Sequence, residues 1–370
     1  MHRLLIFLIA LLLFSGGVTA YAESTEAYDY GRQALEDAVP PEAADLLNDM
    51  QLTPDNGGAA SLSLNGALQT LLSLIKQQMQ APIRLLVSLC GIALLCGLSG
   101  SAADCAQDRL SGLFNTVGVL AGAGLTVAAV SDVLGRTLEL LSSASLFITA
   151  FIPIFAGILS VMGRATTASA INMVTLGATQ LFSQLSVNFL APLCGAVMGL
   201  SITGAIHPQL NLSKLGELVK KLIVWTLSLI MTVFMSILSV QTFVTNSADN
   251  VLIRTAKFAV SSGVPIVGGT ISDAVGTVHG SLSVIKSAVG TYGIIAAAVI
   301  LLPTLINVAC YRAAITCAEA VSDIFGVKEL TALLKSCGAV MAIITAVIAC
   351  FLLLNTIAAV IMLSIGNGSA

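Results

Sequence analysis

Long apolar runs separated by short polar breaks occupy the chain from Ile83 to its end. A helix needs about 20 consecutive apolar residues to cross a bilayer. Runs of this length lie at 83–103, 113–134, 140–162, 222–244, 288–309 and 338–363. The run 170–206 is too long for one crossing, and Pro192 near its middle favours two joined crossings. The pattern predicts an all-α polytopic membrane helix bundle of about eight spans, within a range of seven to nine.

The segment 258–279 departs from this pattern because charges and helix breakers interrupt or precede its apolar run. The residues concerned are Arg254, Lys257, Pro265, Gly268, Gly269 and Asp273. A crossing here brings the total to about nine spans and the C-terminus into the cytoplasm, whereas a re-entrant segment leaves the C-terminus outside. A central Asp costs about 2.5–3.5 kcal/mol on the insertion scale, which does not forbid a crossing. Pro265 and the glycines make a poor helix and favour the re-entrant alternative.

The same segment has a weak internal echo earlier in the chain. The stretches 151–160 and 263–272 share Pro-Ile, a Gly four positions after the Pro, and an aliphatic-Ser pair. Pro153 and Gly157 are the counterparts of Pro265 and Gly269. Paired Pro- and Gly-interrupted segments are typical of duplicated transporter folds. Chance similarity between apolar, glycine-rich segments is the alternative explanation.

Residues 1–22 have the layout of a secretory signal peptide, with an apolar stretch and the small-x-small site Ala20-Tyr21-Ala22. We expect cleavage after Ala22, with an uncleaved anchor helix as the alternative. Residues 23–82 then form an exported N-terminal segment, and 83–370 the multi-pass domain. Nine of the 19 acidic residues lie between Glu23 and Asp55. Two short helices are expected, one between Pro40-Pro41 and the turn at Pro54–Gly58 and one after that turn. The leucines after residue 61 predict an amphipathic helix at the membrane surface or packed on the core.

The basic residues test this map against the positive-inside rule. With the mature N-terminus outside, the expected cytoplasmic loops hold eight bases and the outer side beyond the first span holds four. The eight are Arg109, Arg164, Lys214, Lys220, Lys221, Arg312, Lys328 and Lys335; the four are Arg136, Arg254, Lys257 and Lys286. The excess of Lys and Arg inside agrees with the rule.

The composition excludes a soluble globular protein. Of the 370 residues, 56% are hydrophobic and 9% charged, and the mean hydropathy is +0.97. A soluble surface needs roughly 25% charged residues. No basic run exceeds Lys220-Lys221, so nucleic acid is not an expected partner. The partner that this composition requires is the lipid bilayer.

The sequence predicts no enzyme, metal site or cofactor. Motifs such as H-E-x-x-H, G-x-S-x-G and the Walker loop do not occur. The three histidines are far apart, and the eight cysteines include no C-x-x-C pair. Most cysteines lie in apolar runs, where they are expected to pack as small hydrophobic residues.

Charges at membrane depth are therefore the candidate functional groups. Asp273 is the first candidate, with Arg254, Lys257 or Lys286 as its partner. These residues either line a path or bind a partner chain, or they form a solvated loop whose cations reach lipid head groups. Asp132 and Arg136 are four positions apart, and we expect them at a span end as interface anchors.

The broken segment resembles the stage III sporulation protein AE family of endospore-forming bacteria. The resemblance rests on Lys257-Phe-Ala-Val-Ser, Val264-Pro-Ile-Val-Gly-Gly and Ser272-Asp-Ala-Val. It implies a subunit of a mother-cell complex in the membrane around the forespore. That complex, with a forespore-made membrane protein, forms a channel-like link needed for late forespore development. A stand-alone secondary transporter is the alternative, although a cleaved signal peptide is unusual for that class.

Overall fold

The computed structural model describes residues 26–50, 52–54, 72–104, 110–206, 212–263 and 268–364. The proposed signal peptide, most of the expected amphipathic helix and Pro265 lie outside these residues. The described chain is built from helices, listed here with their bounds: α2 (Glu26–Asp37), α3 (Pro41–Asp49), α5 (Gln80–Asp104), α6 (Leu110–Val161), α7 (Ala165–Leu185), η1 (Ser186–Leu190), α8 (Ala191–Ile206), α9 (Leu212–Gly263), α10 (Gly268–Ile324) and α11 (Lys328–Ser364).

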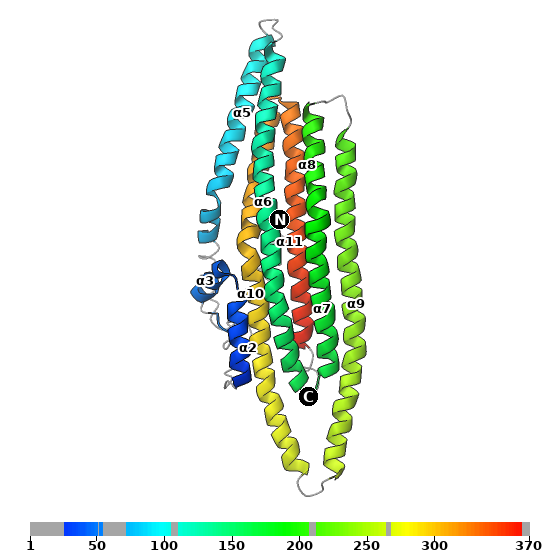
Figure 1. Ribbon diagram of the computed structural model, residues 1–370. Coiled ribbons are helices and arrows are strands. Elements are labelled where there is room, and N and C mark those ends of the chain that lie inside the picture. Colours follow the sequence, from blue (N-terminus) through cyan, green and yellow to red (C-terminus); the bar gives the residue numbers. More distant parts are fainter. Residues whose placement is uncertain are drawn as a thin grey trace.

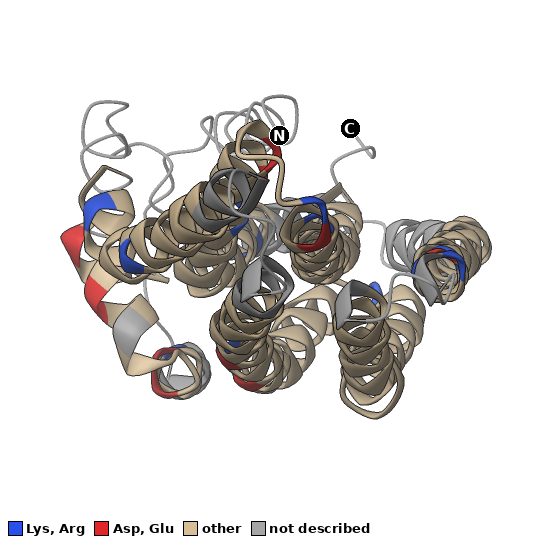
Figure 2. Ribbon diagram, turned by 90° about the horizontal axis from the view of Figure 1, so that it is seen from above, with Lys and Arg blue, Asp and Glu red and all other residues tan. Residues whose placement is uncertain are grey.

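The long helices run side by side as an elongated bundle (Figure 1). Helices α6, α9 and α11 run in one direction, and α5, α7–α8 and α10 run in the other. Within the described ranges, six helices are long and apolar enough to cross a membrane when α7, η1 and α8 count as one. Viewed along the bundle axis, charged residues are sparse among the helices (Figure 2). The predicted all-α membrane bundle is confirmed.

The expected number of spans, about eight, is wrong because two breaks are absent. The runs 113–134 and 140–162 belong to one continuous helix, α6. The residues between them, Gly135 to Glu139, include two charged residues but no proline. A single glycine and exposed charges weaken a helix without ending it, so the polar stretch does not make a loop.

The run 170–206 is also one continuous helical rod. A π-turn, η1, joins α7 to α8 immediately before Pro192. A proline removes one backbone donor and crowds the preceding turn. The wider π-turn is a form in which the helix accommodates such a residue without a loop. The proline therefore produces a local defect in the helix, not the expected pair of crossings.

The described parts of the segment 258–279 are the end of α9 and the start of α10, and Pro265 lies outside the described residues. Helix α9 continues to Gly263, and α10 begins at Gly268. These two helices contain 52 and 57 residues, or about 78 and 86 Å at 1.5 Å per residue. A hydrocarbon core is only about 30 Å thick. The lower ends of α9 and α10 extend past the other helices (Figure 1).

A stack of aromatic rings on α6 sets its distance from α10. Phe147, Phe151 and Phe155 are fully buried, and successive ring centroids lie 6.0 and 5.6 Å apart. Glycines of α10 face them: a Cβ atom at Gly290 would lie 2.8 Å from the ring of Phe155, and one at Gly293 would overlap the ring of Phe151. Small residues allow such close approach between membrane helices.

Two connections are tight turns centred on glycines with positive φ. Gly163 (φ 78°) follows α6, and Gly326 (φ 74°) follows α10. In both turns the amide of the next residue donates to a carbonyl five positions earlier, from Arg164 to Leu159 and from Val327 to Ser322. This is the backbone pattern of a helix C-terminus closed by a left-handed glycine.

The acidic N-terminal segment folds onto the bundle. Helix α3 lies between Pro40 and Pro54, where the sequence predicted a short helix, whereas α2 precedes Pro40 and was not expected. Most of the second expected helix, after Gly58, lies outside the described residues. Helices α2 and α3 contact α6 and α10 respectively. Leu35, Val39 and Leu47 are buried in the common hydrophobic core. Pro40 precedes α3 and Pro41 is its first residue, a position at which proline costs no hydrogen bond.

Candidate functional site

Five of the six sequence candidates of the broken segment lie on the end of α9 or the start of α10, and the sixth, Pro265, lies outside the described residues. Arg254 and Lys257 lie on the last turns of α9, Gly268 and Gly269 begin α10, and Asp273 is in its second turn. Their roles stay predictions. Lys286 is not a partner for Asp273, because thirteen positions of one helix separate them by about 20 Å.

A buried carboxylate joins α9 to the turn between α6 and α7. Asp249 is 1% exposed. Its Oδ2 accepts hydrogen bonds from the Thr167 amide (2.9 Å) and the Thr167 hydroxyl (2.5 Å). Its Oδ1 accepts from the Thr166 amide (3.3 Å). These amides belong to the first turn of α7, so Asp249 caps a helix N-terminus from another helix.

The environment of Asp249 acts on its pKa in two opposing ways. Burial alone raises the pKa, because it disfavours the charged form. The hydrogen bonds from Thr167 and Thr166 favour the charged form and outweigh burial, so the pKa lies below its ordinary value. The carboxylate is therefore ionised at neutral pH.

Two buried cations lie near this capped turn. Arg164, the residue before α7, is 3% exposed, and Lys286 of α10 is fully buried. The two are close enough for their charges to repel each other. The charge map from the sequence placed Arg164 in the cytoplasm and Lys286 outside. That assignment is wrong for at least one of them, because α6, α7 and α10 bring them together. Asp249 was not singled out, since nothing local in the sequence distinguishes it from a loop acid.

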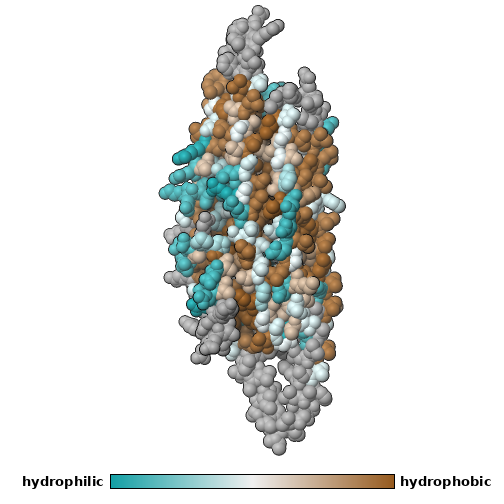
Figure 3. All heavy atoms as spheres, in the orientation of Figure 1, coloured by the Kyte–Doolittle hydropathy of each residue, from teal (hydrophilic) through white to brown (hydrophobic). Residues whose placement is uncertain are grey.

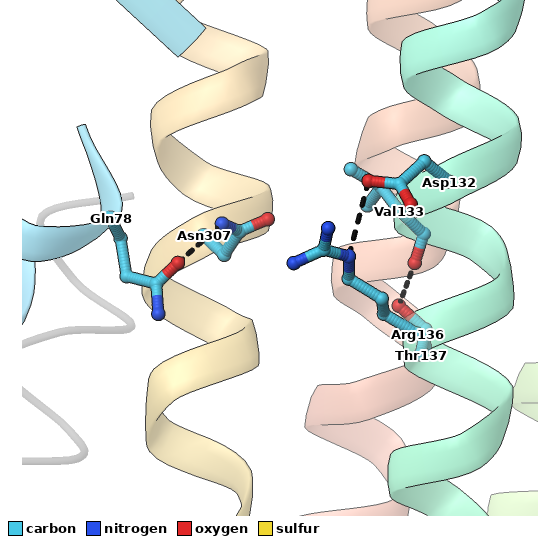
Figure 4. Close-up of polar contacts among 6 residues, drawn as sticks. All are labelled: Gln78, Asp132, Val133, Arg136, Thr137 and Asn307. Atoms are coloured by element: carbon cyan, nitrogen blue, oxygen red, sulfur yellow. Dashed lines mark hydrogen bonds and ion pairs between the residues drawn. The ribbon is translucent and has the colours of Figure 1, made fainter. Parts of the chain in front are cut away.

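A second polar group lies halfway along the bundle (Figure 4). Arg136 Nε and Asp132 Oδ2 are 3.1 Å apart on α6. Both lie near Tyr311 of α10. One turn away on α10, Asn307 donates a hydrogen bond to Gln78 (2.6 Å). Asp132 and Arg136 lie well inside α6, which continues for more than six turns on either side. Because α6 is longer than one bilayer crossing, their role at a span end stays a prediction.

The polar group continues from α6 onto α7. The Gln180 amide lies 3.5 Å from the Thr149 hydroxyl, and Asn188 donates to Gln184 (3.0 Å). Deeper in the bundle, the Thr179 hydroxyl donates to Asn355 of α11 (3.0 Å). Polar side chains thus bridge three helices inside their apolar spans, as polar residues do between membrane helices.

Pro153 and Gly157 lie on the outer surface of α6. The helix continues through Pro153, and a Cβ atom at Gly157 would meet nothing within 4 Å. The stretch 151–160 is therefore mid-helix, whereas its echo 263–272 includes the end of α9 and the start of α10. The two stretches do not form equivalent structures.

Comparison with known proteins identifies the family. The model of the family described as stage III sporulation protein AE matches residues 48–366. The chain belongs to this family. Stage III sporulation protein AE of Bacillus subtilis (strain 168) is 28% identical over 156 residues, which are 42% of this chain and 39% of that protein. No solved structure matches. The stage III sporulation protein AE family is not a known enzyme family.

The cysteines of the described ranges carry no disulfide: Cys90, Cys96, Cys194, Cys310, Cys317, Cys337 and Cys350 have free thiols. Cys96, Cys194 and Cys337 are buried, as expected for small hydrophobic residues, whereas Cys317 is exposed. Within the same ranges, no three His, Cys, Asp or Glu side chains are grouped as metal ligands.

Proposed function

We propose that this chain is a membrane-embedded subunit of a channel or secretion-like complex between mother cell and forespore, required for late forespore development. Family membership over residues 48–366 is the observation that carries the proposal. In this proposal the protein resides in the mother-cell membrane around the forespore, with its mature N-terminus outside the cytoplasm. Its partners are other subunits of the same complex and, through them, a forespore-made membrane protein.

The helix architecture supports a subunit of a larger complex over a stand-alone transporter. Transporters of the duplicated type place their substrate between broken helices at mid-membrane. Here α6 passes Pro153 and α10 passes Pro303 without interruption. The hairpin between α9 and α10 lies beyond the other helices at one end of the bundle (Figure 1), which is the position for contact with a further protein.

Deletion of the gene in its source bacterium tests the proposed function. Membrane-dye microscopy through spore formation should show arrest after engulfment, with small or collapsed forespores and normal vegetative growth. Expression of the intact chain from a second locus should restore spores. Normal spore formation in the deletion strain, or a growth defect on one nutrient, would contradict the sporulation role and favour a transporter.

A further inference from the structure

The outward face of α6 changes character at Ser131. From Thr116 to Ala128 its exposed positions are apolar or small. From Ser131 to Ser160 the exposed positions, which we name the polar face of α6, include a single large aliphatic side chain, Leu146. The polar members are Ser131, Asp132, Arg136, Glu139, Ser142, Thr149 and Ser160. Pro153 and Gly157 belong to the same face.

The polar face lies beside the candidate membrane spans of α9 and α11. Cys337 of α11 contacts Thr126 of α6 and is near Lys220 of α9. At the other end, Asp249 of α9 binds Thr167, just after the α6–α7 turn. Because α6 and α9 run in the same direction, these contacts bracket α9 from Lys220 to Asp249 beside α6 from Thr126 to the turn.

The surface of α9 over the same interval is mostly apolar, with serines and one threonine between its large side chains. Its exposed side chains between Lys221 and Asp249 carry no charge among the residues whose exposure is described. Large exposed members are Leu222, Trp225, Leu229, Val233, Val240 and Phe243. At a single level the bundle is therefore amphipathic across its width. Figure 3 shows hydrophilic residues over the middle of the viewed face and hydrophobic residues along the right, and the hydrophilic residues at the left include those over α2 and α3.

Lipid does not suit the polar face of α6. Hydrocarbon offers no hydrogen bonds, and charges within a span normally face the interior of a bundle or a water-filled cavity. The Arg136 and Asp132 side chains are 62% and 49% exposed. A dry protein partner would gain little hydrophobic energy from a face of serines, glycines and charges. Water satisfies these groups without specific partners.

We propose that the polar face of α6, extended by Gln180, Gln184 and Asn188, lines a water-filled path at membrane depth. Further copies of this chain or other subunits supply the remaining walls, and the apolar surface of α9 faces lipid. The wall carries both signs of charge, from Asp132, Glu139 and Arg136, so it suits hydrophilic solutes without strong selection by charge. This inference deepens the proposed function and rests on the chain acting within an assembly.

Single cysteines in sporulating cells test the path. The background is a full-length chain whose own cysteines are replaced and which still restores spores. Arg136→Cys, Ser142→Cys and Thr149→Cys probe the polar face, and Leu229→Cys and Val240→Cys probe α9 in the same interval. A small cationic methanethiosulfonate should label the first set at least about tenfold faster, because only a hydrated thiol ionises and is reached by the reagent.

Two results would overturn the inference. Equal labelling of both sets means that this part of α6 and of α9 is surrounded by water. No labelling of the polar face in sporulating cells means that protein or lipid covers it. Ser142→Cys and Thr149→Cys keep the test valid if Arg136→Cys fails to accumulate. The deletion phenotype is scored separately, so a failed path leaves the sporulation role standing, and normal spores without the gene leave the labelling pattern interpretable.

Discussion

At the scale of single residues, Asp249 is a buried link between two helices. It links α9 to the first turn of α7 through three hydrogen bonds. The buried cations Arg164 and Lys286 lie near the same turn. A buried carboxylate that accepts several hydrogen bonds is stabilising. An asparagine at the same position has one oxygen and an NH2 group, so at least one of these donors loses its acceptor.

We expect Asp249→Asn to lower the free energy of unfolding by about 1.5–3 kcal/mol at neutral pH, because hydrogen bonds to a charged acceptor are lost. Asp45→Asn, at an exposed position of α3, is the matched control and should change little. Denaturant titration of the purified full-length protein in detergent measures both. Equal stability of the two variants would show that the carboxylate contributes nothing.

The pH dependence gives a second readout of the same residue. The pKa of Asp249 is lowered in the folded protein from 3.8. A lowered pKa contributes stability above the unfolded value, and that contribution is lost as the pH falls through the folded value. The difference between wild type and Asp249→Asn should therefore stay constant from about pH 5 to 8 and shrink below about pH 4. A difference that grows in acid would contradict this cause.

At the scale of elements, close helix contacts fix the bundle more than loops do. The ring of Phe151 fills the space that a side chain on Gly293 would need. Helices α10 and α11 are joined by a two-hydrogen-bond glycine turn, from Gly326 to Asp323 and from Val327 to Ser322. Side-chain packing between helices and short turns of this kind determine the relative positions of the helices.

We expect Gly293→Ala to destabilise the protein by about 1–3 kcal/mol, the usual cost of overpacking. Gly157→Ala, on open surface of the same bundle, is the control and should be neutral or slightly stabilising. Phe151→Ala should cost less in the Gly293→Ala background than alone, since the overlapping ring is gone. Additive effects of the two substitutions would argue against direct contact.

At the scale of the whole molecule, the helix count decides which ends share a side of the membrane. Six crossings among the described residues return the chain to its starting side. The end of α5, the start of α6 and the α10–α11 turn then lie on the opposite side (Figure 1).

Reporter fusions test this arrangement. Alkaline phosphatase placed after Ser364 should be active if the mature N-terminus is outside, and phosphatase placed within 105–109 should be inactive. A cytoplasmic reporter at the same sites should give the opposite pattern. An inactive phosphatase after Ser364 would indicate an odd number of crossings and a cytoplasmic C-terminus.

The fold class could be predicted from the sequence, but the number of continuous helices could not. Apolar runs longer than a bilayer crossing leave few alternatives to a helical membrane bundle. The breaks were harder to infer, because Gly135–Glu139 and Pro192 interrupt hydrophobicity without interrupting the helix. The charge site at the α6–α7 turn joins residues more than 80 positions apart, which periodicity and local charge do not reveal. Family phrases marked the α9–α10 hairpin but not the polar face of α6.

Helices α9 and α10 extend past the others at one end of the bundle (Figure 1). From Asp249, beside the α6–α7 turn, α9 continues for fourteen residues to Gly263, or about 21 Å. Any large body approaching that end of the bundle touches the α9–α10 hairpin before it touches another helix. A rigid body that contacts this end therefore stays about 21 Å from the turn that holds Asp249, unless the ends of α9 and α10 bend. Shortening both helices by matched turns would remove this stand-off and leave the core contacts of α6, α7 and α11 in place.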